Sequence, residues 1–592
     1  MPRSGKPTCT LLFILTLSLL ALYTTHLHHR HPPSSAAKIT ETPSSITGTH
    51  SSPPPATIPS PPTSATSPSV LTSPEPLSPF PPPSTNGTVL PIPLSEPSVA
   101  GNDIVMPYHA YSPSGAAYGE AVFLNYGREQ DYRALGVEVK GCVGLVRRGS
   151  GMSRHEVVAS AAAHGVSAVL MYTEGEFKEG VERGTVMNGL GDPLSPGWAG
   201  IDGGEKLDLN DPRVTEKFPG VPSLPVSEAA AESILASLEG ARVPYEWRES
   251  FKSGARRIRR VGPGPILLNF TYEGELKMAT IHNVFAVIKG SDEPDRGTAA
   301  LLDIARRFAL LMRLGWNPRR TIVLCCWDAE EFGMVGPQGL VQLVGGLLWD
   351  TKIGSTEWVE QNLVNLGSKA VAYLNVDCAA QGPGLFISAT PQLDDLLVEV
   401  KDPDSENARL YERWTAANNG VDIQRLSRVD SDFAPFLQHV GVPSVDLYFG
   451  SDFPVYHTAF DSYDWMINFG DPLFQRHVAV AGIWGLVALH LADDPILPFN
   501  YLSYATELQE YKNVLNTLLE ETISLHPIAA AIQEFIIAAN ETEEEIKKLR
   551  LNNNLDQSTV LRRRMLNDRL MLTERGFLDL EGSLEGNGSS IS

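Results

Sequence analysis

Between about residues 105 and 495, short apolar runs alternate with stretches of helical periodicity. Residues 166–172 and 321–327 are continuous apolar runs of strand length, and residues 299–314 place apolar side chains at helical spacing. Strands that alternate with helices pair most easily as parallel neighbours, because each helix carries the chain back across the sheet. The pattern therefore predicts an α/β fold with a mostly parallel sheet covered by helices on both faces.

The expected elements divide the globular part into three units. An apical α/β unit is expected over 99–275, a larger α/β unit over 276–495 and a helical unit over 496–592. The apical unit should contain strands 121–125, 141–146 and 166–172 and helix 156–164. The larger unit should contain strands 283–288, 321–327, 370–376 and 443–448 and helix 299–314. The helical unit should contain helices 502–525, 528–549 and 559–575.

The amino-terminal part has the composition of a membrane anchor followed by a stalk. Residues 9–23 form an uncharged apolar run preceded by basic residues, which predicts a signal anchor over 9–27 and a cytosolic tail over 1–8. A cleaved signal peptide, with small residues at 34–37, is the alternative. Residues 28–98 are rich in Pro, Ser and Thr and are expected to be a disordered stalk.

An anchor of this orientation places most of the chain in the lumen of the secretory pathway, and we expect the endoplasmic reticulum. Four glycosylation sequons fit a lumenal chain; they begin at Asn86, Asn269, Asn540 and Asn587.

Charge and cysteine content exclude other classes. The chain has 47 Lys and Arg against 69 Asp and Glu, so its net charge is 47 − 69 = −22, which argues against nucleic-acid binding through a broad basic surface. Its five cysteines are too few for a disulfide scaffold and form no CxxC pair. A thiolate zinc site is therefore not expected.

Acidic residues follow two of the expected strands directly, and one histidine lies in the loop after a third. In open α/β sheets, sites form at the carboxyl ends of strands. Carboxylates with a neutral imidazole are typical ligands of catalytic zinc, and a neighbouring glutamate can take the proton from a metal-activated water. The residues in these positions are Asp328, Glu330 and Glu331 after 321–327, Asp377 after 370–376, and Tyr456 and His457 after 443–448.

Structural explanations of the same residues stay open at this point. Acidic residues at 328–331 are also favoured by a helix dipole, Asp377 could cap a helix, and His457 could be a hydrogen-bonded loop residue. The pattern alone supports an α/β hydrolytic enzyme or a binding protein.

Several spaced motifs resemble one family of co-catalytic zinc peptidases. The run Trp327-Asp-Ala-Glu-Glu-Phe-Gly333 is similar to its catalytic signature. Further motifs resemble the glutamate carboxypeptidase II and transferrin receptor family and, most closely, the plant "altered meristem program" carboxypeptidase-like proteins. The resemblance covers about residues 100–580, and its motifs lie at 315–321, 355–358, 373–377, 425–433 and 455–465.

This resemblance implies a zinc-peptidase-type mixed sheet between helices, an inserted protease-associated apical domain and a truncated helical dimerisation domain. It also implies a homodimer that hydrolyses C-terminal peptide bonds with two zinc ions, and a calcium site. The implied roles are Glu330 as general base, Tyr456 as hydrogen-bond donor to the tetrahedral intermediate, Glu331, Asp377 and His457 as zinc ligands, and Glu357 and Glu360 as calcium ligands.

The chain departs from the family in discrete blocks. Arg296 runs directly into Gly297, so the family's first histidine and bridging aspartate are missing, and 337–354 is an extra stretch. The family's first protease segment and its late Lys-Tyr pair are also absent. An alternative or mispredicted transcript explains blocks of this kind, and a degenerate paralogue is the other interpretation. The resemblance then implies an impaired zinc site.

Asp446 and Tyr448 stand near the position where the animal enzyme carries arginines. Because arginine suits bidentate carboxylate binding, a preference for acidic side chains is not predicted. Two alternatives to an active exopeptidase remain: a non-catalytic membrane scaffold or receptor-like member of the same fold, and a partial product without stable function.

Overall fold

The computed structural model describes seventeen segments of the chain, which begin at Pro55. The expected cytosolic tail and signal anchor lie outside them. Within the described segments no single helix is long and apolar enough to cross a membrane, and one bent pair, Tyr463–Gly470 with Gln475–Asp493, passes the length and composition test together. The described residues are 55–60, 69–71, 89–92, 96, 106–149, 151–175, 177–201, 203–250, 258–281, 283–288, 299–329, 353–399, 423–426, 431–450, 453–518, 524–552 and 556–578.

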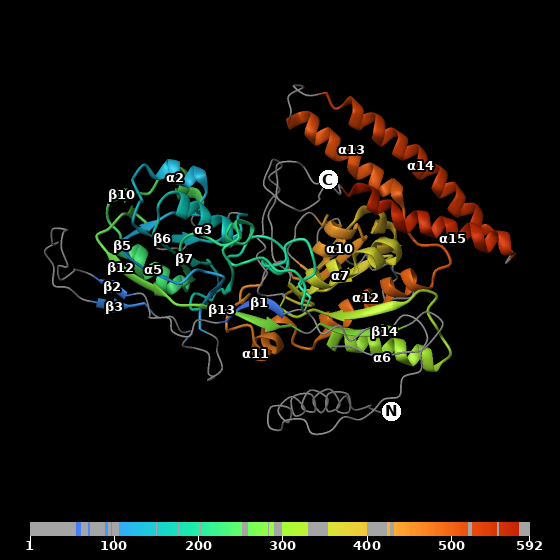
Figure 1. The fold of residues 1–592 in the computed structure, drawn as a ribbon, viewed down its shortest axis with the longest axis horizontal. Helices are drawn as coiled ribbons and strands as arrows, with labels where there is room; N and C mark the ends of the chain where they lie inside the picture. Colours follow the sequence, from blue (N-terminus) through green and yellow to red (C-terminus); the bar gives the residue numbers. More distant parts are fainter. Residues whose placement is uncertain are drawn as a thin grey trace, which may run out of the picture. The chain divides into compact units, whose positions relative to one another are not determined.

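The apical unit is built on a seven-stranded sheet in the order β3-β2-β12-β5-β6-β7-β9 (Figure 1). The neighbours β5, β6, β7 and β9 are parallel, whereas β12 is antiparallel to both β5 and β2. The strands are β2 (Ser69–Leu71), β3 (Val89–Pro91), β5 (Gly115–Phe123), β6 (Val143–Arg147), β7 (Ala168–Tyr172), β9 (Ser223–Pro225) and β12 (Leu267–Tyr272). The helices are α2 (Glu129–Leu135), α3 (Arg154–Ala163), α4 (Pro212–Thr215) and α5 (Glu228–Ala236).

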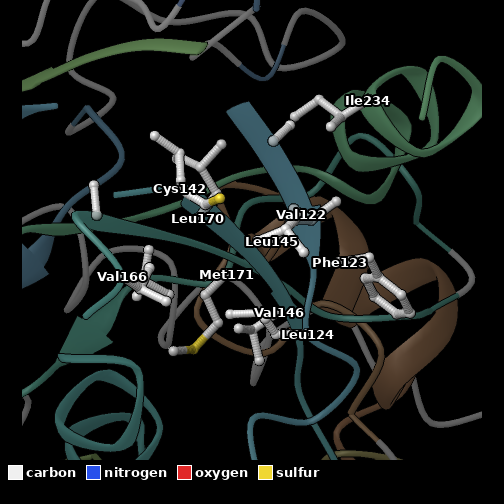
Figure 2. Close-up of a cluster of buried hydrophobic side chains, with 14 of the residues drawn as sticks. Val122, Phe123, Leu124, Cys142, Leu145, Val146, Val166, Leu170, Met171 and Ile234 are labelled. Atoms are coloured by element: carbon white, nitrogen blue, oxygen red, sulfur yellow. The ribbon is translucent and has the colours of Figure 1, made fainter. Parts of the chain in front are cut away.

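The central strands of this sheet are buried on both faces. Every residue of β6 and β7 is buried, as expected for parallel strands covered on two sides. Figure 2 shows part of this core, with Val122 of β5, Leu145 of β6 and Leu170 of β7 packed together. Helix α3 begins at a Ser153 capping box. The strand–helix–strand prediction for this unit is confirmed.

The Pro-, Ser- and Thr-rich segment differs from the sequence expectation. Three short strands fall within 28–98: β2 and β3 extend the apical sheet beyond β12, and β1 (Pro55–Ser60) pairs with β13 (Glu275–Thr280). Composition correctly shows that this segment has little apolar surface to bury. It does not show that a short extended segment can hydrogen-bond to an edge strand of a folded sheet, where proline is tolerated.

The larger unit contains a mixed set of strands. β14 pairs with β15 antiparallel, and β18 pairs with β16 in parallel and with β17 antiparallel. The strands are β14 (Val284–Ile288), β15 (Ile322–Cys326), β16 (Tyr373–Asn375), β17 (Leu385–Ala389) and β18 (Ser444–Phe449). The helices are α6 (Ala299–Arg313), α7 (Ile353–Lys369), α8 (Asp394–Glu399), α10 (Phe433–Val440), α11 (Tyr463–Trp465) and α12 (Gln475–Asp493). Other short pairs are β4 (His109–Ala110) with β8 (Gly184–Thr185) and β10 (Ala241–Arg242) with β11 (Arg260–Gly262).

The predicted strands of this unit are confirmed, but the prediction of a mostly parallel sheet is wrong for the described residues. The only parallel pair among these five strands is β16 with β18. Strand β17 was not expected, because it is a short apolar segment between two turns. No helix lies between β16 and β17, so the chain does not cross back to run parallel to β16.

The carboxyl-terminal part is helical, as predicted. Figure 1 draws α13 (Tyr501–Leu518), α14 (His526–Leu551) and α15 (Gln557–Leu572), and α13 and α14 contact each other along their length. Ile532, Ala539 and Ile546 are the buried positions at one-heptad spacing on α14, which places them on one face. Ala539 and Ile546 join the core that contains β17, β18 and α12.

A short 3₁₀ helix, η5 (Thr573–Phe577), follows α15 and contacts the larger unit through hydrogen bonds. The Arg575 guanidinium donates to the Ala370 carbonyl at 2.5 Å, just beyond the end of α7. The buried Glu574 carboxylate accepts from Gln392 Nε2 at 2.7 Å and Tyr504 Oη at 3.3 Å. Burial outweighs these two bonds and raises the pKa of Glu574 to about 7.

Glu574→Gln is expected to stabilise the protein at neutral pH. The raised pKa means that the folded state keeps a proton which the unfolded state loses, so wild-type stability falls as pH rises from about 4.5 to about 7. Glutamine mimics the protonated acid. The free energy of unfolding of Glu574→Gln, relative to that of wild type, should therefore be larger at about pH 8 than at about pH 4, by up to roughly 3 kcal/mol.

Thermal unfolding at both pH values checks this, with the exposed Glu544→Gln as the control. A stability difference that does not change with pH would contradict the assignment.

Candidate metal and active site

Strand β15 ends in a sharp turn. The Asp328 amide donates to Asn283 Oδ1 at 3.0 Å, and Ala329 has φ 56°, a left-handed conformation that is uncommon for a residue with a Cβ. The next two residues along the chain are Glu330 and Glu331, the predicted base and zinc ligand. Both lie outside the described residues, so their roles stay predictions.

Asn283 also holds the start of α7 against this turn. Its Nδ2 donates to the Gly354 carbonyl at 2.8 Å. A Cβ at Gly354 would lie 2.3 Å from the Asp328 carbonyl oxygen, so the two chain segments are in close contact. Residues 329 and 353 therefore lie at one junction. Most of the extra stretch predicted at 337–354 lies outside the described residues, and its last two residues are the first two of α7.

An aromatic cluster packs the end of β15 against β16 and α10. Trp327 Nε1 donates to Tyr373 Oη at 2.9 Å, and the Tyr373 ring stacks on Phe436 with 3.9 Å between ring centroids. Trp358 of α7 packs against Trp327 and Phe436. This cluster therefore fixes the position of the end of β15 relative to β16, α7 and α10.

Asp377 follows β16 and is exposed. Because β16 and β18 are parallel neighbours, their carboxyl ends reach the same edge of the sheet. Asn375 Nδ2 locks the two strands together through Asp446 Oδ1 at 2.9 Å and Ser431 Oγ at 2.7 Å. The Asp446 carboxylate is thus engaged within the sheet, and Tyr448 stacks on a neighbouring strand's ring.

His457 lies in a strained turn beyond β18. Its φ is 57°, and it exchanges two contacts with the backbone of Arg183: the Arg183 amide donates to the His457 carbonyl at 3.1 Å, and His457 Nδ1 lies 3.1 Å from the Arg183 carbonyl. A carbonyl can only accept, so His457 Nδ1 carries the proton of this hydrogen bond. A histidine that binds a metal through Nε2 typically donates its Nδ1–H in this way. The Tyr456 ring stacks on the imidazole at 3.8 Å.

The predicted calcium ligands lie on one turn of α7. The buried Glu357 carboxylate accepts the amides of Asp192 and Gly200, both at 2.6 Å. Glu360 Oε2 is buried and, within the described residues, has no hydrogen-bond partner. Burial raises the pKa of Glu357 to about 8 and raises that of Glu360 well above its usual range. Gly191 is required here, because a Cβ would lie 2.6 Å from Glu357 Oε1.

A neutral histidine borders the same carboxylates. His439 Nδ1 approaches Glu360 Oε1 at 3.8 Å. Burial lowers the pKa of His439 to about 4, so this contact is not an ion pair at neutral pH. The nearby Lys206 forms its ion pair with Asp192, at 3.1 Å. The partly buried Lys217 also borders the Glu357–Glu360 pair, and one carboxylate oxygen of Glu360 has no hydrogen-bond partner among the described residues.

Two sequons can be placed. Asn269 on β12 and Asn540 on α14 are both exposed, whereas Asn86 and Asn587 lie outside the described residues. Glycosylation at the four positions stays a prediction.

The described residues contain no cluster of three or more His, Cys, Asp or Glu side chains that could hold a metal ion. Of the predicted zinc ligands, Asp377 and His457 belong to the described part of the chain. The Nδ1 hydrogen bond of His457 to a carbonyl is of the kind that metal-binding histidines make.

Comparison with known families assigns the chain to the hydrolases, in the class of metallopeptidases. Residues 295–471 match the model of Peptidase family M28, and residues 523–589 match the Transferrin receptor-like dimerisation domain. The chain belongs to the glutamate carboxypeptidase-like members of Peptidase family M28.

Three relatives illustrate this membership. The chain is 53% identical to the Probable glutamate carboxypeptidase AMP1 of Arabidopsis thaliana, over 84% of this chain and 72% of the relative. It is 48% identical to the Probable glutamate carboxypeptidase VP8 of Zea mays, over 84% and 70%. It is 32% identical to the Aminopeptidase NAALADL1 of Mus musculus, over 81% and 71%. The predicted family resemblance is confirmed.

Sequence reasoning missed the residues that position the site. Asn283, Asp192 and Arg183 act through hydrogen bonds to distant segments, and none stands beside a candidate ligand in the sequence. The Gly- and Pro-rich run 189–204 was the one available signal for the loop around Glu357.

Asn283→Ala is expected to destabilise the junction between β15 and α7. The substitution leaves the Asp328 amide without its acceptor and the Gly354 carbonyl without its donor. The free energy of unfolding should fall by about 2 kcal/mol. Thermal unfolding checks this against Asn362→Ala, which removes a single bond to Trp358 within α7. Equal unfolding temperatures for the two variants would contradict the role given to Asn283.

Proposed function

We propose that the protein is a zinc-dependent exopeptidase that hydrolyses C-terminal peptide bonds. Two relatives of 53% and 48% identity carry the name glutamate carboxypeptidase. The observation that carries the proposal is the His457 turn, because its Nδ1 contact with the Arg183 carbonyl is the contact that a histidine makes when it binds a metal through Nε2.

The residues that would hold zinc are His457 through Nε2, Asp377 and Glu331. Bound zinc would lower the pKa of a coordinated water and polarise the scissile carbonyl. Glu330 is proposed to take the proton from the attacking water. The Tyr456 hydroxyl is proposed to donate to the developing oxyanion, since its ring stacks directly on the ligand imidazole.

Specificity is proposed to favour side chains other than acidic ones at the penultimate position. Asp446 adds negative charge at the strand where the animal enzyme carries arginine, and its carboxylate already accepts from Asn375. One relative is named an aminopeptidase, so peptides blocked at either end provide the direct assay: cleavage of the N-blocked peptide alone supports a carboxypeptidase.

The same proposal includes a calcium ion at Glu357 and Glu360, a homodimer formed through 523–589, and a type II anchor at 9–27 that leaves most of the chain in the lumen of the endoplasmic reticulum. The unsatisfied Glu360 Oε2 supports the calcium site. The match to a dimerisation domain supports the homodimer.

A non-catalytic scaffold on the same fold is the second candidate. The direct junction of Arg296 and Gly297, without the family's histidine and bridging aspartate, favours it. Zinc content separates the two: about two zinc ions per chain support the peptidase, and less than one at micromolar zinc supports the scaffold.

Glu330→Gln should abolish peptidase activity, because an amide cannot take the proton from the attacking water. The variant should retain zinc, because Glu330 is not one of the proposed zinc ligands. Hydrolysis of an N-blocked peptide and zinc content are the two measurements. Glu399→Gln, at the end of α8, is the control. Turnover by Glu330→Gln near the wild-type rate would remove Glu330 as the base.

Calcium affinity is expected to rise with pH through the titration of Glu357, whose pKa is about 8. The raised pKa values mean that the cation-free carboxyls hold protons that calcium must displace, so affinity should fall by up to about tenfold per pH unit for each proton released. Calorimetry at about pH 6 and about pH 8.5 tests this. Affinity that does not depend on pH, or that survives in Glu357→Gln, would contradict the site.

A further inference from the structure

The segment before the apical unit contributes one buried acid to the His457 turn. Glu96 has a fully buried side chain. Its Oε1 accepts the Val181 amide at 2.9 Å and the Ala459 amide at 3.0 Å, and its Oε2 pairs with Arg183 at 2.8 Å. One carboxylate therefore binds two apical residues and a residue two positions beyond His457.

We propose that Glu96 is a positioning residue for His457, and that it sets the imidazole for metal binding through Arg183 and Ala459. This inference rests on the proposed role of His457 as a zinc ligand. Glu96 itself does not touch the ligand site.

The His457 conformation needs such support. A left-handed backbone costs of order 1 kcal/mol for a residue with a Cβ, so the turn persists only where its surroundings hold it. The contacts that hold it are the paired backbone groups of Arg183 on one side and the Ala459 amide on the other. Glu96 binds both sides, through the Arg183 guanidinium and the Ala459 amide.

The Arg183 carbonyl is fixed from a second direction. Arg154 Nη2 donates to it at 3.0 Å, so the oxygen that accepts from His457 Nδ1 is already oriented. Arg154 and Arg148 also pair with Glu182. Burial would raise the pKa of Glu182, but these two guanidinium groups outweigh it and hold the pKa at about 2. The segment 181–183 is therefore held in place by ion pairs and hydrogen bonds to Glu96, Arg148 and Arg154.

Close packing supports the same segment. A Cβ at Gly180 would lie 3.0 Å from Thr458 Cγ2, so the apical segment is also in close contact with the residue that follows His457. A small displacement of 181–183 would then rotate the imidazole. Partners of a ligating histidine typically change metal affinity by 10- to 100-fold when they are substituted.

Cobalt(II) and zinc binding to the full chain test this. Glu96→Gln replaces one accepting oxygen by a donor that faces donors, and it should weaken metal binding at least tenfold in chelator competition and alter the visible spectrum of bound cobalt. Asp131→Asn is the matched control, because Asp131 is also a buried acid that accepts a backbone amide and pairs with an arginine, Arg128.

Arg183→Lys keeps the buried positive charge and covers the case in which Glu96→Gln does not fold; it should also weaken metal binding, by a smaller factor. His457→Ala separates the two levels of the argument. If His457→Ala binds metal as wild type does, the proposed function fails and this inference with it. If His457→Ala loses metal while folded Glu96→Gln and Arg183→Lys bind like Asp131→Asn, only the positioning role of Glu96 is overturned.

Discussion

The arrangement of the candidate site depends on the burial of Glu357. Removing a carboxylate from water is costly unless hydrogen bonds replace the lost hydration, and here the amides of Asp192 and Gly200 supply them. The apical loop must therefore stay in contact with α7, and Gly191 permits the close approach. Since α7 begins beside Asp328, this one buried acid also locates the end of β15, from which the predicted catalytic glutamates follow.

Helix α7 is fixed at its other end by the carboxyl-terminal part of the chain. Arg575 donates to the Ala370 carbonyl, and the neighbouring Glu574 is buried against Gln392. Residues of the apical loop, the β15 turn and η5 thus all contact a single helix. Backbone groups that are satisfied by distant side chains connect these parts, in addition to shared apolar contacts. The same principle recurs at His457, where Arg183 supplies the backbone partners.

Apolar periodicity predicted most of the strands and the three carboxyl-terminal helices, because burial leaves a local signature. The candidate ligands Asp377 and His457 were predicted because Asp377 directly follows a strand and His457 lies in the loop after another. Asn283 and Glu96 could not be found, because their partners lie far along the chain and a hydrogen bond of this kind leaves no periodic pattern. The strands within the Pro-rich segment were missed for a related reason: edge pairing uses backbone groups and needs no particular side chains.

The most direct test of the metallopeptidase account is anomalous diffraction at the zinc edge from crystals of the full chain grown with zinc. The account predicts a peak within coordination distance of His457 Nε2 and the Asp377 carboxylate, with Glu331 beside it. A zinc-bound crystal whose anomalous peaks all lie away from these three side chains would contradict it and leave only common ancestry with the peptidases.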